Sequence, residues 1–280
     1  LREQGIDGLL VTHPADLFYL SGTTRGGCLF LPCEGLPIRA DGGPGLPIER
    51  IADRVRDVQD RPPAVLGLEM DVLPVQQYMR VRRAFSGSEL RDGSPALLGA
   101  RMLKSAWEIG WMEQVAERTA QVFARAGDAM APGLTEIAFA GRLEAIAGAL
   151  GISGRVRVRD HRTEGYPWHV LAGESGGTVG VLDAPATGEG TSPAFPCGAG
   201  YRTLAPGEPV MVDFAVRMGG YHMDETRMLA MGSLSREAED ACRAAIEIHD
   251  RVLERIEPGR TADELFRCSR DTARELGYEE

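Results

Sequence analysis

The sequence predicts two domains, an N-terminal α/β domain over residues 1–97 and an α+β domain with an internal duplication over residues 98–280. Three observations support this prediction. Short apolar runs alternate with possible helices at the start of the chain, a pair of helical signals returns at a fixed interval, and one segment alternates like a β-hairpin. A length of 280 residues is compatible with two domains.

Composition excludes some classes of function. The hydrophobic fraction of 43% and the charged fraction of 26% are typical of globular proteins. A net charge of −10 argues against a nucleic-acid partner, since such proteins need a basic face. The apolar runs are too short to span a membrane, so no membrane partner is expected. Five scattered cysteines without a C-x-x-C pair indicate a reduced, cytoplasmic protein.

Three short apolar runs, at residues 5–12, 28–31 and 64–68, predict buried strands in the first domain. Residues 36–61 between them are rich in glycine, proline and charge. Strands separated by possible helices predict a small α/β domain. Residues 92–95, Asp-Gly-Ser-Pro, predict a linker at its end.

The second domain begins with two predicted helices. Residues 104–130 carry helical periodicity without an internal proline, and Pro132-Gly133 follows them. Thr135 can cap the next helix, which covers residues 136–150 and stops at Gly151.

A second pair of predicted helices has the same layout. Ser235 can cap a helix that continues to about residue 256, followed by Pro258-Gly259. Thr261 and Glu264 have the spacing of a capping box, in which each side chain accepts a hydrogen bond from the other residue's amide. This last helix stops at Gly277.

Corresponding landmarks of the two helix pairs are separated by 126 positions. They are Pro132-Gly133 and Pro258-Gly259, Thr135 and Thr261, and Leu150-Gly151 and Leu276-Gly277. Three landmarks at one offset favour a duplication over chance recurrence of Pro-Gly before a helix. Strand-like stretches at 155–159, 166–171 and 208–231 follow the first pair, so we expect the second half to be incomplete in this chain.

Residues 207–229 predict a β-hairpin with its turn at Met218-Gly219-Gly220. With Met218 and Gly219 as a two-residue loop, Asp213 and Asp224 would face each other directly. Like charges so placed, with Cβ atoms about 5 Å apart, are destabilising. The pair could be solvated, share a proton or hold a cation. The partly apolar flanks of this face favour a cation in a cleft.

Other side chains are candidates for supporting roles. His222 and Thr226 share the predicted face with the two aspartates, so His222 could support a metal ligand and Thr226 could orient a metal-bound water. Alternatively, His222 could lie at a solvated end of the hairpin, and Thr226 could be a β-branched residue that simply suits a strand. His169, on a predicted strand, is a weak candidate for a catalytic residue, against the alternative of a packed structural histidine. Cys197 has no histidine near it in the sequence and is not expected to be a nucleophile.

Three motifs carry a resemblance to a known family. Val212-Asp213-Phe214 followed by Gly220-Tyr221-x-x-Asp224-x-Thr226-Arg227 resembles the metal-binding hairpin of the creatinase/methionine aminopeptidase superfamily. Asp16-Leu-Phe-Tyr-Leu-Ser-Gly22 and Arg101-Met-Leu-Lys104-Ser105-x-x-Glu108-Ile109 resemble its two-domain branch of Xaa-Pro aminopeptidases, prolidases and creatinases. The resemblance covers essentially the whole chain. It implies a creatinase-type N-terminal domain and a pita-bread catalytic domain with two pseudo-symmetric halves.

The resemblance also implies a dinuclear metal site. Asp213 would bind one metal and Asp224 would bridge both, and Mn, Co, Fe or Zn would suit such ligands. A metal-bridging hydroxide would attack the peptide carbonyl. The remaining family ligands, one histidine and two glutamates, and the catalytic proton carrier are expected beyond Glu280. The histidine that the family places before its first aspartate is missing from residues 191–200, and His169 could take its place.

The predicted function is that of a cytoplasmic, metal-dependent Xaa-Pro aminopeptidase or Xaa-Pro dipeptidase. A small peptide is the expected substrate, and a homodimer is the expected assembly. Two alternatives remain open. One is a non-peptidase on the same scaffold, either a creatinase-like C–N hydrolase or a lyase. The other is an inactive member that binds a peptide or a protein.

Overall fold

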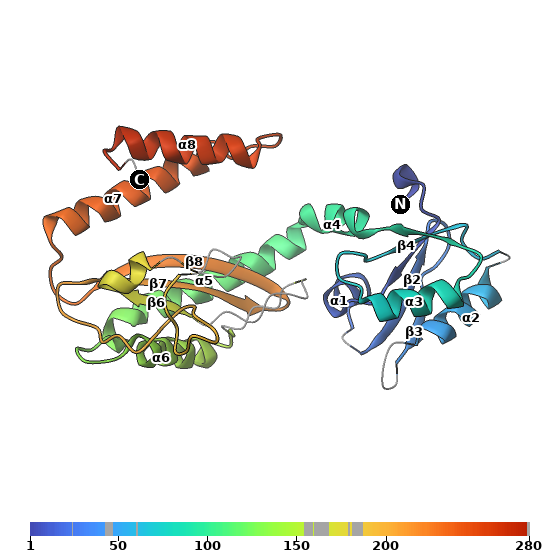
Figure 1. Cartoon of the computed structure of the whole chain (residues 1–280), viewed down its shortest axis with the longest axis horizontal. Helices are drawn as coiled ribbons and strands as arrows, with labels where there is room; N and C mark the ends of the chain where they lie inside the picture. The colour runs from blue at the N-terminus through green and yellow to red at the C-terminus, as the bar shows by residue number, and fades with distance from the viewer. Residues whose placement is uncertain are drawn as a thin grey trace. The chain divides into compact units, whose positions relative to one another are not determined.

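The fold is described from a computed structural model over residues 1–23, 25–42, 47–59, 61–153, 159, 168–178, 180 and 187–278. The chain divides into two compact units. The first contains Leu1–Ile109 with Arg157–Glu164, and the second contains Gly110–Val156 with Gly165–Glu280 (Figure 1). The predicted boundary between residues 97 and 98 falls inside helix α4 (Ser94–Met102), whereas the compact units divide after Ile109.

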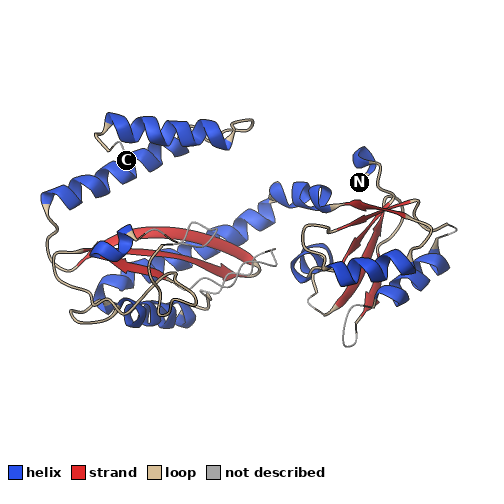
Figure 2. Cartoon of the chain, in the orientation of Figure 1, coloured by secondary structure: helices blue, strands red, loops and turns tan. Residues whose placement is uncertain are grey.

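The first unit is an α/β structure around a five-stranded mixed sheet of order β3-β2-β1-β4-β5 (Figure 2). The central strand β1 (Gly8–Val11) pairs antiparallel with β2 (Gly27–Pro32) and parallel with β4 (Val65–Leu68). These are the three strands that the apolar runs predict. The other elements are η1 (Arg2–Gln4), β3 (Ile38–Asp41), β5 (Glu89–Asp92), α1 (Pro14–Ser21), α2 (Ile48–Val58), α3 (Val75–Ala84) and α4.

Two predictions for this unit need correction. Residues 92–95 are not a linker, because Asp92 ends β5 and Ser94 is the buried first residue of α4. The glycine- and proline-rich stretch at 36–61 contains both β3 and α2. Ile48, Ile51 and Val55 are fully buried on one face of α2, a helical spacing that the flanking glycines and charges obscure.

The second unit contains a three-stranded antiparallel sheet with strands β6 (His169–Ala172), β7 (Pro209–Met218) and β8 (Tyr221–Ala230). Helices α5 (Ala106–Ala129) and α6 (Glu136–Ala149) cover one face of this sheet (Figure 1). The side chains of Val210, Val212, Phe214 and Val216 pack there. The predicted hairpin is therefore confirmed, and its face opposite Asp213 and Asp224 is the one that packs on the helices.

Helices α7 (Arg236–Leu253) and α8 (Ala262–Glu275) repeat the pattern of the first helix pair. Both α6 and α8 begin after a threonine whose hydroxyl accepts a backbone N–H, Thr135 from Ala138 and Thr261 from Glu264. Both end before a glycine with positive φ, 78° at Gly151 and 87° at Gly277. Since α8 starts and ends 126 positions after α6, the predicted helical repeat is confirmed.

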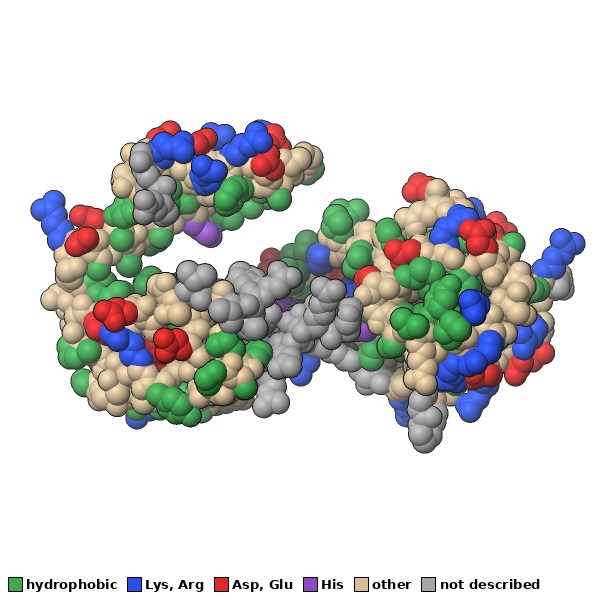
Figure 3. Space-filling view, in the orientation of Figure 1, with side chains coloured by type: hydrophobic (Ala, Val, Ile, Leu, Met, Phe, Trp, Pro, Cys, Tyr) green, Lys and Arg blue, Asp and Glu red, His purple; other side chains and the backbone are tan. Residues whose placement is uncertain are grey.

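The two helix pairs differ in how far their apolar faces are covered. Helices α5 and α6 bury their apolar faces against the sheet. By contrast, Ile246 of α7 is 61% exposed and Phe266 of α8 is 60% exposed. Hydrophobic side chains gather along one edge of this pair in Figure 3. The strands predicted at 155–159 and at the beginning of 166–171 lie almost entirely outside the described residues. Of the helices described, none has both the length and the apolar character that crossing a membrane requires.

Candidate metal centre on the β7–β8 hairpin

The hairpin turn determines how the two aspartates are related. Gly219 and Gly220, with φ of 62° and 91°, form the two-residue loop, and Met218 pairs with Tyr221. A loop with positive φ at both residues matches the twist of the strands and is readily formed by glycine. A loop at Met218-Gly219 would force the methionine into that conformation at a steric cost.

The observed register corrects the predicted pairing of Asp213 with Asp224. Asp213 lies opposite Thr226, and Asp224 lies opposite Ala215. The two aspartates are therefore diagonal neighbours, about 7 Å apart at the backbone, rather than directly opposed. The prediction that they share one face is confirmed, and His222 and Thr226 lie on that face with them.

The pKa values of the two carboxyl groups shift in opposite directions. Burial raises the pKa of Asp213, but hydrogen bonds from His169 and Thr226 outweigh it, so the net shift is downward. The pKa of Asp224 is raised by burial and then by the negative charge of Asp213. The face therefore holds one stabilised carboxylate and one acid that resists ionisation without a nearby cation.

Asp213 is held at both carboxylate oxygens. Thr226, directly across the ladder, donates from Oγ1 to Asp213 Oδ1 at 2.7 Å. His169, its partner on β6, lies with Nδ1 at 3.2 Å from Asp213 Oδ2. The two contacts fix the orientation of the carboxylate, whose side chain is still 27% exposed. The sequence places Thr226 near this site, but not its direct contact with Asp213.

Cys197 is the second partner of His169. Its Sγ lies 3.3 Å from His169 Nε2, and both side chains are buried. The sequence offers Cys197 no neighbouring histidine, but the fold brings His169 against it. The two residues are 28 positions apart in the sequence. No motif spacing predicts that residues so far apart will be in contact. Burial raises the pKa of the Cys197 thiol.

A buried glutamate that sequence reasoning missed anchors this segment. Glu136, in the first turn of α6, accepts hydrogen bonds from Ala172 N at 2.7 Å and Gly200 N at 2.9 Å. Gly190 lets the chain pass close to Cys197, since a Cβ there would lie 2.7 Å from the carbonyl oxygen of Cys197. The signal in the sequence is an acidic residue directly after the helix cap Thr135.

The other predicted site residue, His222, lies opposite Arg217 near the turn. Its role beside a metal ligand stays a prediction.

The described residues fit part of a metal site. Two carboxylates on one face suit a hard or borderline divalent cation, and a cation would relieve the repulsion that raises the pKa of Asp224. Among these described residues, no group of three or more His, Cys, Asp or Glu side chains converges as a ligand set. Asp213 and Asp224 would therefore supply two ligands of such a site and not all of them.

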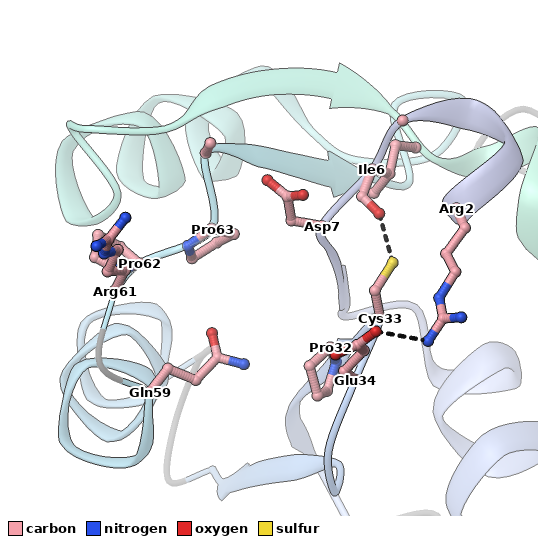
Figure 4. Close-up of a pocket in the computed structure, with 12 residues that line it drawn as sticks. Arg2, Ile6, Asp7, Pro32, Cys33, Glu34, Gln59, Arg61, Pro62 and Pro63 are labelled. Atoms are coloured by element: carbon pink, nitrogen blue, oxygen red, sulfur yellow. Dashed lines mark hydrogen bonds and ion pairs between the residues drawn. The ribbon is translucent and has the colours of Figure 1, made fainter.

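A separate open pocket of about 640 Å³ lies in the first unit and contains none of these residues (Figure 4). Along its rim, Arg2 Nη2 lies 2.9 Å from Glu34 Oε1, and Cys33 Sγ donates to the Ile6 carbonyl at 2.7 Å. The side chains of Arg2, Glu34 and Cys33 at this rim thus already have partners in the protein.

Comparison with known families identifies the class to which this fold and hairpin belong. The model of metallopeptidase family M24 matches residues 110–280, and that of the creatinase/prolidase N-terminal domain matches residues 1–42. The chain is a member of the M24 metallopeptidase family, in its creatinase/prolidase branch, as the hairpin motif predicts.

Individual relatives are distant. The chain is 23% identical to the uncharacterized peptidase YqhT of Bacillus subtilis over 98% of its length, and 26% identical to an Xaa-Pro dipeptidase of Lactobacillus helveticus over 84%. It spans 75% and 57% of those two proteins.

Solved structures agree on the fold. The X-Pro aminopeptidase of Thermotoga maritima matches with a TM-score of 0.77 at 20% identity, over 98% of this chain and 77% of that one. The Xaa-Pro dipeptidase of Bacillus anthracis matches with a TM-score of 0.78 at 21% identity, over 99% and 75%. The predicted two-domain, pita-bread fold is confirmed, in a chain about 75% as long as these neighbours.

Proposed function

We propose that this chain is part of a metal-dependent peptidase that hydrolyses small peptides next to proline, as an Xaa-Pro dipeptidase or aminopeptidase. Membership of a metallopeptidase family supports the class of reaction. Preference for proline rests on relatives and structural neighbours that are named for it. The observation that carries the proposal is the shared face of Asp213 and Asp224, on which Asp213 is held ionised by His169 and Thr226.

In this proposal Asp213 and Asp224 are metal ligands at a site for two divalent ions, with Mn, Co, Fe and Zn as candidates. Bound divalent ions would activate water and polarise the scissile carbonyl. The residues of this chain would orient the ligands, with Thr226 and His169 fixing the Asp213 carboxylate. Catalytic proton transfer is assigned to residues beyond Glu280. The homodimer and the cytoplasmic location remain predictions from the sequence.

The test compares metal content and hydrolysis in the full-length protein and in its Asp213→Asn and Asp224→Asn variants. Substrates are Xaa-Pro dipeptides, longer Xaa-Pro peptides and creatine, each with added Mn or Co. We expect both variants to lose metal and at least about 100-fold in peptide hydrolysis, because each removes a charged ligand. Asp240→Asn on α7 is the control, since its exposed carboxylate pairs with Arg243 and should affect neither readout. Full metal loading and activity in the Asp224→Asn variant would contradict the proposal.

A non-peptidase reaction on the same scaffold is the second candidate. Residues 191–200 contain no histidine, and Cys197 in this stretch lies buried against His169. A substrate-binding group that the resemblance implies is therefore missing, which favours a creatinase-like C–N hydrolase or a lyase. Turnover of creatine without turnover of any Xaa-Pro peptide would select this candidate. Retained metal without turnover of any substrate would point to the inactive binding protein.

A further inference from the structure

Three side chains from separate segments form a continuous line that ends on Asp213. Cys197 Sγ lies 3.3 Å from His169 Nε2, and His169 Nδ1 lies 3.2 Å from Asp213 Oδ2. Cys197 is 1% exposed, and the His169 side chain is 10% exposed. Both ring nitrogens of His169 thus have partners inside the protein.

The chemistry of the three groups sets the direction of their hydrogen bonds. An ionised carboxylate only accepts hydrogen bonds, so His169 Nδ1 must carry the hydrogen that points to Asp213. A neutral imidazole has one N–H, which leaves Nε2 as an acceptor. The neighbouring thiol can donate to it. The Cys197 S–H therefore favours the tautomer in which His169 donates to Asp213.

We propose that His169 is a positioning residue for Asp213, held by the Cys197 thiol in the tautomer that donates from Nδ1 to the carboxylate. This inference deepens the proposed function, on which it rests for the assignment of Asp213 as a metal ligand. It gives His169 a different role from the catalytic one considered from the sequence. Groups that hydrogen-bond to a metal ligand without binding the metal themselves fix the orientation of that ligand. Their loss costs about 10–100-fold in metal affinity.

A nucleophilic Cys197 is a poorer explanation of the same contacts. A reactive cysteine needs a lowered pKa and access to substrate. Cys197 is almost fully buried, and burial raises the pKa of its thiol. The contacts of the Cys197 thiol are better explained by a hydrogen bond that it donates to His169.

The first test reads the tautomer of His169 directly, in metal-free full-length protein labelled with ¹⁵N-histidine. We expect a neutral ring with its hydrogen on Nδ1, assigned by the signal that disappears in His169→Asn. Cys197→Ala should lower the population of the neutral Nδ1–H form, because the acceptor at Nε2 loses its donor, whereas Cys197→Ser should preserve that form. An Nε2–H ring or an imidazolium in the unmodified protein would overturn the proposal.

The second test measures Mn²⁺ affinity by calorimetric titration of metal-free protein. His169→Ala should weaken binding at least about tenfold. His169→Asn should restore it to within about threefold of the parent, because the asparagine amide can donate from near the Nδ1 position. Equal loss in both variants, with unchanged thermal unfolding, would overturn the positioning role.

Matched controls separate this effect from general damage. His249→Asn changes an exposed histidine of α7 beside Asp250, and Cys242→Ala changes another α7 side chain. Neither should alter the His169 ring signal or Mn²⁺ affinity. If the protein binds no divalent metal, the proposed function fails, while the ring signal still decides whether His169 donates to Asp213.

Discussion

Asp213 and Asp224 are both carboxylic acids on the same face of the hairpin, but the groups that surround them differ. Asp213 receives hydrogen bonds at both oxygens, from Thr226 and His169. Asp224 has the negative charge of Asp213 beside it and a raised pKa. A cation bound between them would lower the pKa of Asp224, so that both carboxylates would be ionised and could act as ligands.

The Thr226 hydroxyl provides a direct test at this scale. Thr226→Val keeps the shape of the side chain but removes the donor that lies 2.7 Å from Asp213 Oδ1. We expect Mn²⁺ affinity to fall about tenfold, because the ligand loses one of its two orienting bonds. Thr226→Ser retains the hydroxyl and should stay within about threefold of the parent in the same titration. Equal affinities for the valine and serine variants would show that the hydroxyl does not position Asp213.

Among the elements, the β7–β8 turn is constrained both by its backbone and by a neighbouring helix. Gly219 has a φ of 62°, and a Cβ there would lie 2.6 Å from Cε3 of Trp111 on α5. We expect Gly219→Ala to lower the free energy of unfolding through both backbone strain and this contact. Gly232→Ala is the control, because its φ is 80° but nothing lies within 4 Å of the added methyl.

Urea unfolding of the two variants separates these contributions. The strained backbone alone costs about 1–2 kcal/mol. We expect Gly219→Ala to lose at least about 1 kcal/mol more than Gly232→Ala, since an overpacked contact adds to the strain. Equal losses would mean that Trp111 moves aside without cost and does not constrain the turn.

The elements also show which features could be predicted from the sequence. Helices α6 and α8 were predictable because their caps, Thr135 and Thr261, and their closing glycines are local signals. The register was predicted two residues out of place, although Gly219-Gly220 offers a better two-residue loop than Met218-Gly219. The contact of His169 with Cys197 has no local signal, because the two residues are 28 positions apart in the sequence.

At the scale of the whole molecule, a cluster of buried charges ties a distant segment into the first unit. Arg159 Nε lies 2.5 Å from Asp16 Oδ2, and Arg101 Nη1 lies 2.6 Å from Asp16 Oδ1. Arg159 Nη2 also lies 4.0 Å from Glu69 Oε1. The Arg159 side chain is 7% exposed, and those of Asp16 and Glu69 are fully buried. Removing one partner from a buried ionic group leaves an uncompensated charge, so the loss of Arg159 or Asp16 alone is expected to destabilise the first unit.

Glu69 should make the stability of the protein depend on pH. Burial, followed by its interaction with Asp16, raises the pKa of Glu69 from 4.5 to about 7. The folded state then binds more protons than the unfolded state between these values. This contribution to stability is fully present below about pH 4.5 and is lost as the pH rises through 7, by up to about 3 kcal/mol.

The measurement is thermal unfolding between pH 5 and 8 for the parent and for Glu69→Gln, which resembles the protonated acid. The parent should lose stability relative to the variant as the pH rises across this range. Glu89→Gln, at an exposed glutamate of β5, should follow the parent. A difference between Glu69→Gln and the parent that stays constant with pH would contradict the raised pKa.

The two-glycine loop also makes the candidate metal centre sensitive to insertions and deletions. Because successive strand residues alternate between faces, one extra residue in β8 before Asp224 would turn this aspartate toward the side that packs on the helices. The charge would then lie among Val212, Phe214 and Val216, where burial is costly. Relatives that keep both aspartates are therefore expected to conserve the number of residues between them.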